Sequence, residues 1–377
     1  MTNTHTAIER FADWYRKGAL PLWAKVAWDD THGGFFESLD FDGAPINGPR
    51  RVRVQSRQVY TFTQAGLRGW HADAEDLAAK GFDYLIDRAC PNDAARGCAH
   101  TLSNEGTVTN DKRDLYDQAF LLLACSARIR AGCQRAQTIA NNTISFLDRD
   151  LASPHGGWLE SDAGELPRRQ NPHMHLFEAF MALYQATNEN IWKERAAQIA
   201  DLFSRHFYDR SNGVLLEFFT EDLTKPDPQT GTSIEPGHMM EWVWLLGAHE
   251  RMGSRDYSRE KQTLYKNALA LADKKSGFLP DSLQQGDTPA ARARRLWPQT
   301  EFIRGAFTLA RDENDDFAQN GAQMIEALFS SYLDQPVKGL WCDQFNAGGL
   351  SCAKDVPASI LYHLFEAVVE TLRFKEA

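Results

Sequence analysis

Three histidines, His175, His238 and His363, lie near the start of segments whose apolar residues recur at helical spacing. An imidazole has a pKa near neutrality, so it can take up a proton and return it during a reaction. One histidine on an apolar helix face is most often a hydrogen-bonded core residue. Three at equivalent positions favour a shared site, and we predict that they perform acid–base chemistry.

Polar and charged side chains accompany these histidines. Glu241 follows His238 by three residues, so both lie on one helix face, where a carboxylate can orient the imidazole and raise its pKa. Arg57 can neutralise the oxyanion that forms when a carbon beside a carbonyl loses its proton. Such a set suits enediol chemistry on a sugar. The other candidates at these helix starts are Gln55, Tyr116, Asp117, Asn171, Gln299 and Glu301.

Two other kinds of active site use some of the same residue types. A glycoside hydrolase needs two carboxylates beside the scissile bond, for which Asp117, Glu241 and Glu301 are available. A metal site needs clustered ligands, but the sequence has no His-x-x-x-His pair, and His173 and His175 point to different sides of a helix. The number of histidines favours isomerisation, and we expect neither a metal nor another cofactor.

A repeat of about sixty residues positions these segments. A glycine followed by an apolar or aromatic residue recurs at positions 34, 97, 157, 213, 277 and 339. A polar loop and then an apolar helical segment follow each glycine, and a more charged helical segment lies between the apolar segment and the next glycine. Two helices of about 15 residues with their connections fill a repeat of this size.

Six such helical hairpins closed into a ring would form an (α/α)6 barrel, an all-α fold. The more apolar helix of each pair would lie inside, with its N-terminal end at the mouth of the barrel. We expect one domain over residues 1–377, with short β-hairpins confined to the mouth loops. An open helical solenoid is the alternative, although no capping repeat is evident.

The composition restricts the class of protein. The chain has 377 residues, 43% of them hydrophobic, and 41 basic against 51 acidic residues give a net charge of −10. Nucleic acids and anionic membranes are therefore unfavourable partners. No window is apolar enough for a membrane span, and six cysteines without Cys-x-x-Cys spacing suggest free thiols. We expect a cytoplasmic monomer or homo-oligomer that binds a monosaccharide.

Five motifs in chain order resemble the N-acylglucosamine 2-epimerase superfamily. They are Gln55-x-Arg57, Asn171-Pro172-His173-Met174-His175, Pro236-Gly237-His238-x-x-Glu241-Trp242, Trp297-Pro298-Gln299-x-Glu301 and Tyr362-His363. The superfamily comprises (α/α)6-barrel epimerases and isomerases of sugars, so the resemblance implies the same fold and a sugar substrate.

The resemblance also implies roles for individual residues. His238 and His363 would form the acid–base pair at C1 and C2, without indicating which of them takes the C2 proton. His175 would assist ring opening or hold the open-chain sugar. Arg57 would bind the enediolate oxygen, and Glu241 would orient His238. The predicted substrate-binding residues are Tyr116, Asn171, Trp297, Glu301 and Gln299.

The C-terminal motif Pro357-Ala358-Ser359-x-x-Tyr362-His363 resembles the mannose isomerase-like branch. That branch implies conversion of D-mannose to D-fructose through a cis-enediol. The loop over 224–231 lacks the arginine of sulfoquinovose-handling relatives, and Leu296-Trp297 replaces the Trp-Trp pair of cellobiose epimerases. A sugar 2-epimerase and a non-catalytic sugar-binding barrel remain alternatives. A third is a mannose-6-phosphate isomerase, with possible phosphate ligands Arg168, Arg169, Arg304 and Lys354.

Overall fold

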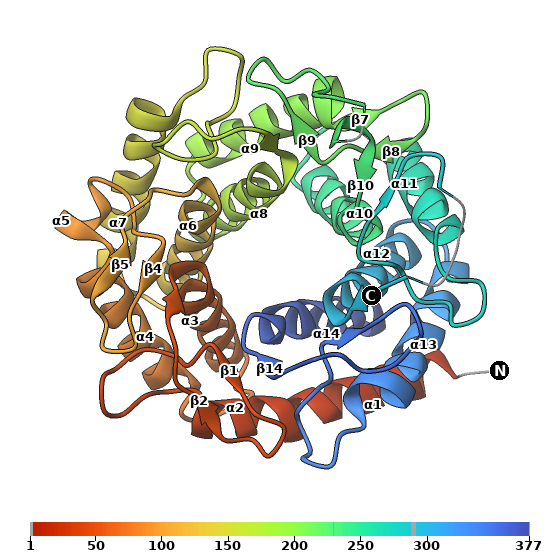
Figure 1. Ribbon diagram of the computed structural model, residues 1–377, viewed down its shortest axis with the longest axis horizontal. Coiled ribbons are helices and arrows are strands. Elements are labelled where there is room, and N and C mark those ends of the chain that lie inside the picture. The colour runs from red at the N-terminus through yellow and green to blue at the C-terminus, as the bar shows by residue number, and fades with distance from the viewer. Residues whose placement is uncertain (1–2, 229, 288–291, 377) are drawn as a thin grey trace.

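Twelve main helices form two concentric rings in the computed structural model, which describes residues 3–228, 230–287 and 292–376 (Figure 1). The inner ring contains α3 (Val52–Leu67), α6 (Leu115–Arg130), α8 (Gln170–Thr187), α10 (Pro236–Arg251), α12 (Leu296–Asp312) and α14 (Ile360–Glu376). The outer ring contains α1 (Thr4–Trp14), α4 (Ala74–Ala89), α7 (Gln134–Phe146), α9 (Asn190–Leu202), α11 (Ser258–Ala270) and α13 (Asp316–Leu328). The predicted (α/α)6 barrel is confirmed.

Burial separates the two rings as the apolar patterns predict. α10 buries 14 of its 16 residues, whereas its outer partner α11 buries 4 of 13. A helix that is apolar on most sides needs neighbours on most sides, and a helix with one apolar stripe packs at the surface. None of the helices in the described residues combines the length and apolar character required to cross a membrane.

The ring is closed by helices from opposite ends of the chain. Five inner helices are followed directly by their outer partners, but the outer neighbour of α14 is α1 (Figure 1). The Lys375 ammonium lies 2.6 Å from the Glu9 carboxylate, and the Tyr15 and Phe365 ring centroids are 6.0 Å apart. The sixth hairpin is therefore discontinuous in sequence, and the open solenoid is excluded.

Very short antiparallel strands connect neighbouring repeats at the mouth. The strand before an inner helix pairs with a strand after the glycine turn of the next repeat, and the isolated bridge Asp114–Ser161 makes the equivalent link. The pairs are β3 (Arg50–Arg51) with β4 (Thr101–Leu102), β6 (Arg168–Arg169) with β9 (Phe218–Phe219), β10 (Ser233–Ile234) with β11 (Leu283–Gln284), β12 (Arg294–Arg295) with β13 (Gln344–Phe345), and β14 (Val356–Pro357) with β1 (Ser38–Leu39).

The predicted local hairpins also occur. They pair β1 with β2 (Pro45–Ile46), β4 with β5 (Val108–Asn110), and β7 (Tyr208–Asp209) with β8 (Val214–Leu215). Links between repeats were not predicted, because two-residue strands leave no pattern in the sequence. They hold the six mouth loops in a continuous ring above the inner helices.

Glutamine side chains anchor the glycine turns to the inner helices. The Gln55 amide accepts from the Phe35 N–H at 2.7 Å and donates to the Phe35 carbonyl at 2.8 Å. Gln118 makes the same pair of bonds to Cys98, as Gln299 does to Leu279. Since each pair satisfies a buried N–H and a buried C=O, this contact explains why the glycine turns recur at equivalent positions.

Candidate active site

A cavity of about 410 Å³ lies where the inner helices begin. This size is typical of small-molecule sites. Eight of the ten predicted site residues line it: Arg57, Tyr116, Asn171, His175, His238, Glu241, Trp297 and His363. All six inner helices begin at the same end of the ring, so side chains from all six repeats meet in this cavity.

His363 is a neutral imidazole. Its Nδ1 lies 2.7 Å from Glu301 Oε1, and only 5% of the residue is exposed. Burial, with the nearby Arg57 and Arg304 guanidinium groups, holds the pKa of His363 well below its usual value. With Nδ1–H donating to the Glu301 carboxylate, Nε2 carries a lone pair and can act as a base.

His238 has the opposite charge state. Its Nδ1 lies 3.0 Å from Glu217 Oε2 and 3.6 Å from Glu235 Oε2. Burial disfavours the charged ring, but these two carboxylates outweigh that effect and raise the pKa of His238 to about 9. His238 is therefore an imidazolium at neutral pH, with both ring nitrogens as donors.

Asn171 fits this assignment of protons. The Asn171 amide nitrogen lies 3.1 Å from His238 Nε2, and its Oδ1 has no hydrogen-bond partner among the described residues. Rotating the Asn171 side-chain amide by 180° exchanges its nitrogen and oxygen. The rotated amide offers an acceptor to the Nε2–H of an imidazolium, whereas the amide nitrogen does not. We therefore assign the orientation in which Asn171 Oδ1 accepts from His238.

Trp297 lies beside both imidazoles. Its ring centroid is 4.9 Å from that of His238 and 5.9 Å from that of His363. One indole thus connects a charged and a neutral histidine along one wall of the cavity. Indole faces also suit the C–H surface of a sugar.

Arg57, Tyr116 and His175 form the opposing part of the site. Arg57 Nη2 donates to the Tyr116 hydroxyl at 2.8 Å, and that hydroxyl lies 3.5 Å from His175 Nε2. Burial lowers the pKa of His175 to about 4, although Glu178 contacts its Nδ1 at 3.3 Å. His175 is consequently neutral, and Arg57 supplies positive charge for an oxyanion.

The predicted role of Glu241 is confirmed in part: Glu241 lines the cavity and helps to raise the pKa of His238, but other carboxylates contact the imidazole. Glu241 Oε1 lies 3.8 Å from His175 Nδ1 and has no hydrogen-bond partner, whereas Glu217 and Glu235 hold His238. Burial raises the pKa of Glu241 well above its usual value, and neighbouring carboxylates add to this effect. A protonated Glu241 can donate to a substrate oxygen. Helical spacing gave the face of α10 but not the partners of His238, which precede α10 in the chain.

Glu217 and Glu235 were missed in the sequence, although the repeat contains a signal for them. In three repeats an acidic residue after the glycine turn binds the arginine that precedes the inner helix. In the fourth repeat that position is Glu235, so Glu217 has no such arginine and contacts His238 instead. The three arginine pairs are Glu37–Arg51, Glu160–Arg169 and Asp281–Arg295.

Glu301 and Gln299 do not line the cavity, contrary to the prediction. Glu301 is fully buried between His363 and Arg304, whose Nη1 lies 3.3 Å from Glu301 Oε2. Gln299 is also fully buried and binds the Leu279 backbone. Both residues support the site from beneath.

Replacing Gln299 by alanine is expected to destabilise the protein by about 3 kcal/mol, because two buried backbone groups of Leu279 lose their partners. KM should stay near the wild-type value. Denaturant unfolding and steady-state kinetics measure the two quantities. Gln118→Ala removes the equivalent contact to Cys98 and is the matched variant. A higher KM in the Gln299 variant alone would instead support sugar binding by Gln299.

A buried layer around Arg304 closes the bottom of the cavity. Arg304 Nη2 lies 3.1 Å from both Glu178 and Glu366, and its guanidinium stacks 3.5 Å from the Trp244 ring. Arg304 is therefore unavailable to a substrate phosphate. So is Arg168, which donates to the carbonyls of Gly156, Trp158 and Glu221.

Among the other predicted phosphate ligands, Arg169 binds Glu160 and Lys354 does not line this cavity. The arginines that do line its mouth are Arg51, Arg53 and Arg295.

Within the residues that the structure describes, three groups of carboxylate and histidine atoms are close enough to hold a cation. Potential ligand atoms lie within 4.8 Å of one another in His175–Glu178–Glu241, in Glu217–Glu235–His238, and in His100–Asp114–Asp117. Each of the first two groups contributes two residues that line the cavity: His175 and Glu241, and Glu235 and His238. Since a metal needs deprotonated ligands, the second group would have to lose the proton of His238 to bind one.

Comparisons with known proteins identify relatives of this chain and structures with a similar fold. The family model for N-acylglucosamine 2-epimerase matches residues 34–367. The mannose-6-phosphate isomerase of Rhizobium meliloti (strain 1021) is 34% identical, covering 97% of this chain and 97% of that protein. The D-mannose isomerase of Thermobifida fusca is 27% identical over 84% of this chain and 82% of that protein. The cellobiose 2-epimerase structure from Spirochaeta thermophila DSM 6192 superposes with a TM-score of 0.88 at 23% identity, covering 99% of this chain and 97% of the other.

Proposed function

This chain belongs to the N-acylglucosamine 2-epimerase family, and we propose that it interconverts D-mannose and D-fructose. The observation that carries the proposal is the opposite charge state of two histidines beside one indole: neutral His363 and protonated His238. Enediol chemistry needs one group that accepts a proton from carbon and another that donates to oxygen. A glycosidase would need paired carboxylates at the bond. Of the candidates Asp117, Glu241 and Glu301, only Glu241 lines the cavity.

The reaction begins with the open-chain aldose. His363 Nε2 removes the C2 proton, the C2–H electron pair forms the C1=C2 bond, and the carbonyl electron pair moves onto O1. His238 protonates O1, and Arg57 stabilises the charge that develops on the oxygen. His363 then returns its proton to C1 while the O2 proton passes back to His238. A ketose results, and both histidines recover their starting protons.

The remaining cavity residues position the sugar. His175 is neutral beside the Tyr116 hydroxyl, so it can exchange a proton with a ring oxygen during opening. Burial raises the pKa of Glu241 and so favours its protonated form, which can donate to a sugar oxygen. Fixing the open-chain sugar at several oxygens brings C2 to His363 in a reactive geometry.

Chelator-treated protein incubated with D-mannose in D2O should form deuterated fructose, as followed by proton NMR. The reason is that the proposed steps use only histidine and arginine side chains. Activity that returns only after divalent metal is added would contradict the metal-free steps. Glucose as the product would instead indicate 2-epimerisation, and sugar binding without turnover would support a non-catalytic barrel.

Mannose 6-phosphate is a second candidate substrate, favoured by the arginines at the cavity mouth. Arg51 and Arg295 are engaged by Glu37 and Asp281. Arg53 lines the cavity, and its guanidinium makes a longer contact of 3.6 Å to Asp117. Its other N–H groups can therefore donate to a phosphate. The Rhizobium meliloti relative carries the name of this activity.

If the substrate is phosphorylated, Arg53→Gln should raise KM for mannose 6-phosphate about tenfold, the effect of losing one charge-assisted hydrogen bond. KM for D-mannose should not change. Arg51→Gln is the control, because Glu37 already holds the Arg51 guanidinium. Equal KM effects on the two sugars would argue against phosphate binding by Arg53.

A further inference from the structure

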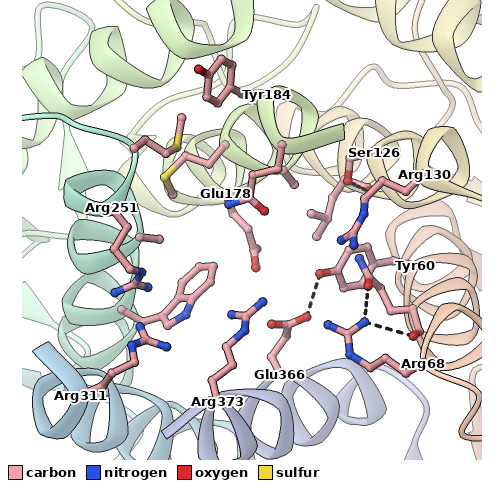
Figure 2. Close-up of a pocket in the computed structure, with 18 residues that line it drawn as sticks. Tyr60, Arg68, Ser126, Arg130, Glu178, Tyr184, Arg251, Arg311, Glu366 and Arg373 are labelled. Atoms are coloured by element: carbon pink, nitrogen blue, oxygen red, sulfur yellow. Dashed lines mark hydrogen bonds between the residues drawn. The ribbon is translucent and has the colours of Figure 1, made fainter. Parts of the chain in front are cut away.

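A second cavity of about 460 Å³ lies at the other end of the barrel, where the inner helices end. It shares no lining residue with the candidate active site. Figure 2 shows arginine side chains from five inner helices directed into this space. These residues are Arg68, Arg130, Arg251, Arg311 and Arg373.

Two of the five arginines lack a carboxylate partner in the described part of the chain. Arg68 donates only to Gln64, one turn back on the same helix, and Arg130 has no hydrogen-bond or ion-pair partner there. The other three bind carboxylates: Arg251 pairs with Asp312 at 3.0 Å, Arg311 with Glu370 at 2.9 Å, and Arg373 with Glu370 at 3.1 Å.

Glu366 raises the pKa of Arg68 through its charge, but in the described residues neither Glu178 nor Glu366 forms an ion pair with Arg68 or Arg130. Glu178 and Glu366 each lie 3.1 Å from the buried Arg304 beneath them. Glu366 also accepts from the Tyr60 hydroxyl at 2.8 Å (Figure 2). Both carboxylates form ion pairs with Arg304, and the five arginines around the cavity leave it positively charged. The chain as a whole has a net charge of −10.

Stabilising helix ends is a simpler role for these arginines, since cations interact favourably with the C-terminus of a helix. That role does not require the five side chains to converge. Convergence has a cost: besides burial, Arg373 and Arg130 help lower the pKa of Arg68, and Arg311 does the same for Arg251. A bound anion would reduce the repulsion between these guanidinium groups and favour their charged form.

One side of the cavity is apolar. Side chains there offer hydrophobic and aromatic surface next to the arginines, and they come mainly from α6, α8 and α10. They are Leu123, Met181, Ala182, Tyr184, Trp244 and Met252. Because arginine forks match phosphate oxygens and the apolar wall suits carbon, we propose that this cavity binds a small organic phosphate.

Calorimetric titration with phenyl phosphate tests the proposal on the full chain. Binding with one-to-one stoichiometry is expected, and it should weaken at least about tenfold in the double variant Arg68→Gln/Arg130→Gln, which loses two charge-assisted contacts. Arg88→Gln is the matched control, because it removes an exposed arginine from the last turn of outer helix α4. That variant should bind as wild type does.

Saturating D-fructose distinguishes the two cavities. Binding that persists with sugar present supports the far cavity, whereas competition by sugar would place the phosphate in the candidate active site and overturn the proposal. Absent binding, or equal affinity in the double variant, would also overturn it. Inorganic phosphate should bind more weakly, and equal affinity would remove the role of the apolar wall. The titration requires no turnover, so its result is independent of the proposed isomerase activity.

Discussion

Replacing His363 by glutamine is expected to lower kcat about a thousandfold and leave KM close to the wild-type value. The proposed base is lost, because glutamine cannot take a proton from carbon at neutral pH. The Arg57, Tyr116 and His238 contacts to the sugar are unaffected. Initial rates measure kcat and KM, and proton NMR in D2O follows exchange at C2, which should stop together with turnover.

His173→Gln is the matched control. His173 is likewise a buried histidine near the start of an inner helix, but its ring nitrogens contact the Trp158 N–H and the Arg169 carbonyl. Its loss should reduce stability and spare kcat per folded molecule. If the His363 variant retained C2 exchange and His238→Gln abolished it, the roles of acid and base would be reversed.

Replacing Glu217 by glutamine is expected to move the alkaline limb of the kcat profile to lower pH by at least about one unit, the effect of losing one close charge. In the wild type, His238 has a raised pKa of about 9, so the acid form is present below that pH and is lost as the pH rises through it. Without Glu217, burial again disfavours the imidazolium, and its pKa falls. Activity at pH 8 should therefore drop sharply. A kcat–pH profile of both proteins measures the shift.

The acidic limb gives a second check on the same variant. It depends on His363, whose pKa lies well below its usual value, so it should be the same in both proteins. Glu160→Gln removes the equivalent acid of another repeat, one that binds Arg169, and should leave the alkaline limb in place. An unchanged limb in Glu217→Gln would show that His238 is not the group that titrates there.

The fold was predictable because the sequence pattern that specifies it, a glycine turn followed by an apolar helix, occurs six times. Each glycine turn, apolar helix and charged helix recurs at a similar interval, and a pattern that recurs this way specifies both the element and its neighbours. The discontinuous hairpin of α1 and α14 was less visible, since its two helices come from opposite ends of the chain. The two-residue strands were not readable at all, because they depend on loop geometry.

The site was predictable by position more than by role. Helical phase placed His175, His238 and His363 in one cavity, as observed. It did not identify which carboxylate each imidazole meets, because Glu217 lies in a mouth loop before α10, and Glu301 lies on α12 whereas His363 lies on α14. Glu217 was therefore missed and Glu241 was given its role. The different charge states of His238 and His363 follow from those partners, of which Glu235 alone is close to its histidine in the sequence.

Because α1 and α14 close the ring, the barrel can be completed only after the last helix has been synthesised. Chains emerge from the ribosome N-terminus first, and early segments begin to fold before later ones exist. The first outer helix, α1, must wait for the last inner helix, α14, to cover its apolar face. His363 lies on that same late helix, so the proposed base and the final packing partner arrive together. Under the proposed mechanism, a chain that still lacks α14 would have neither a closed ring nor its base.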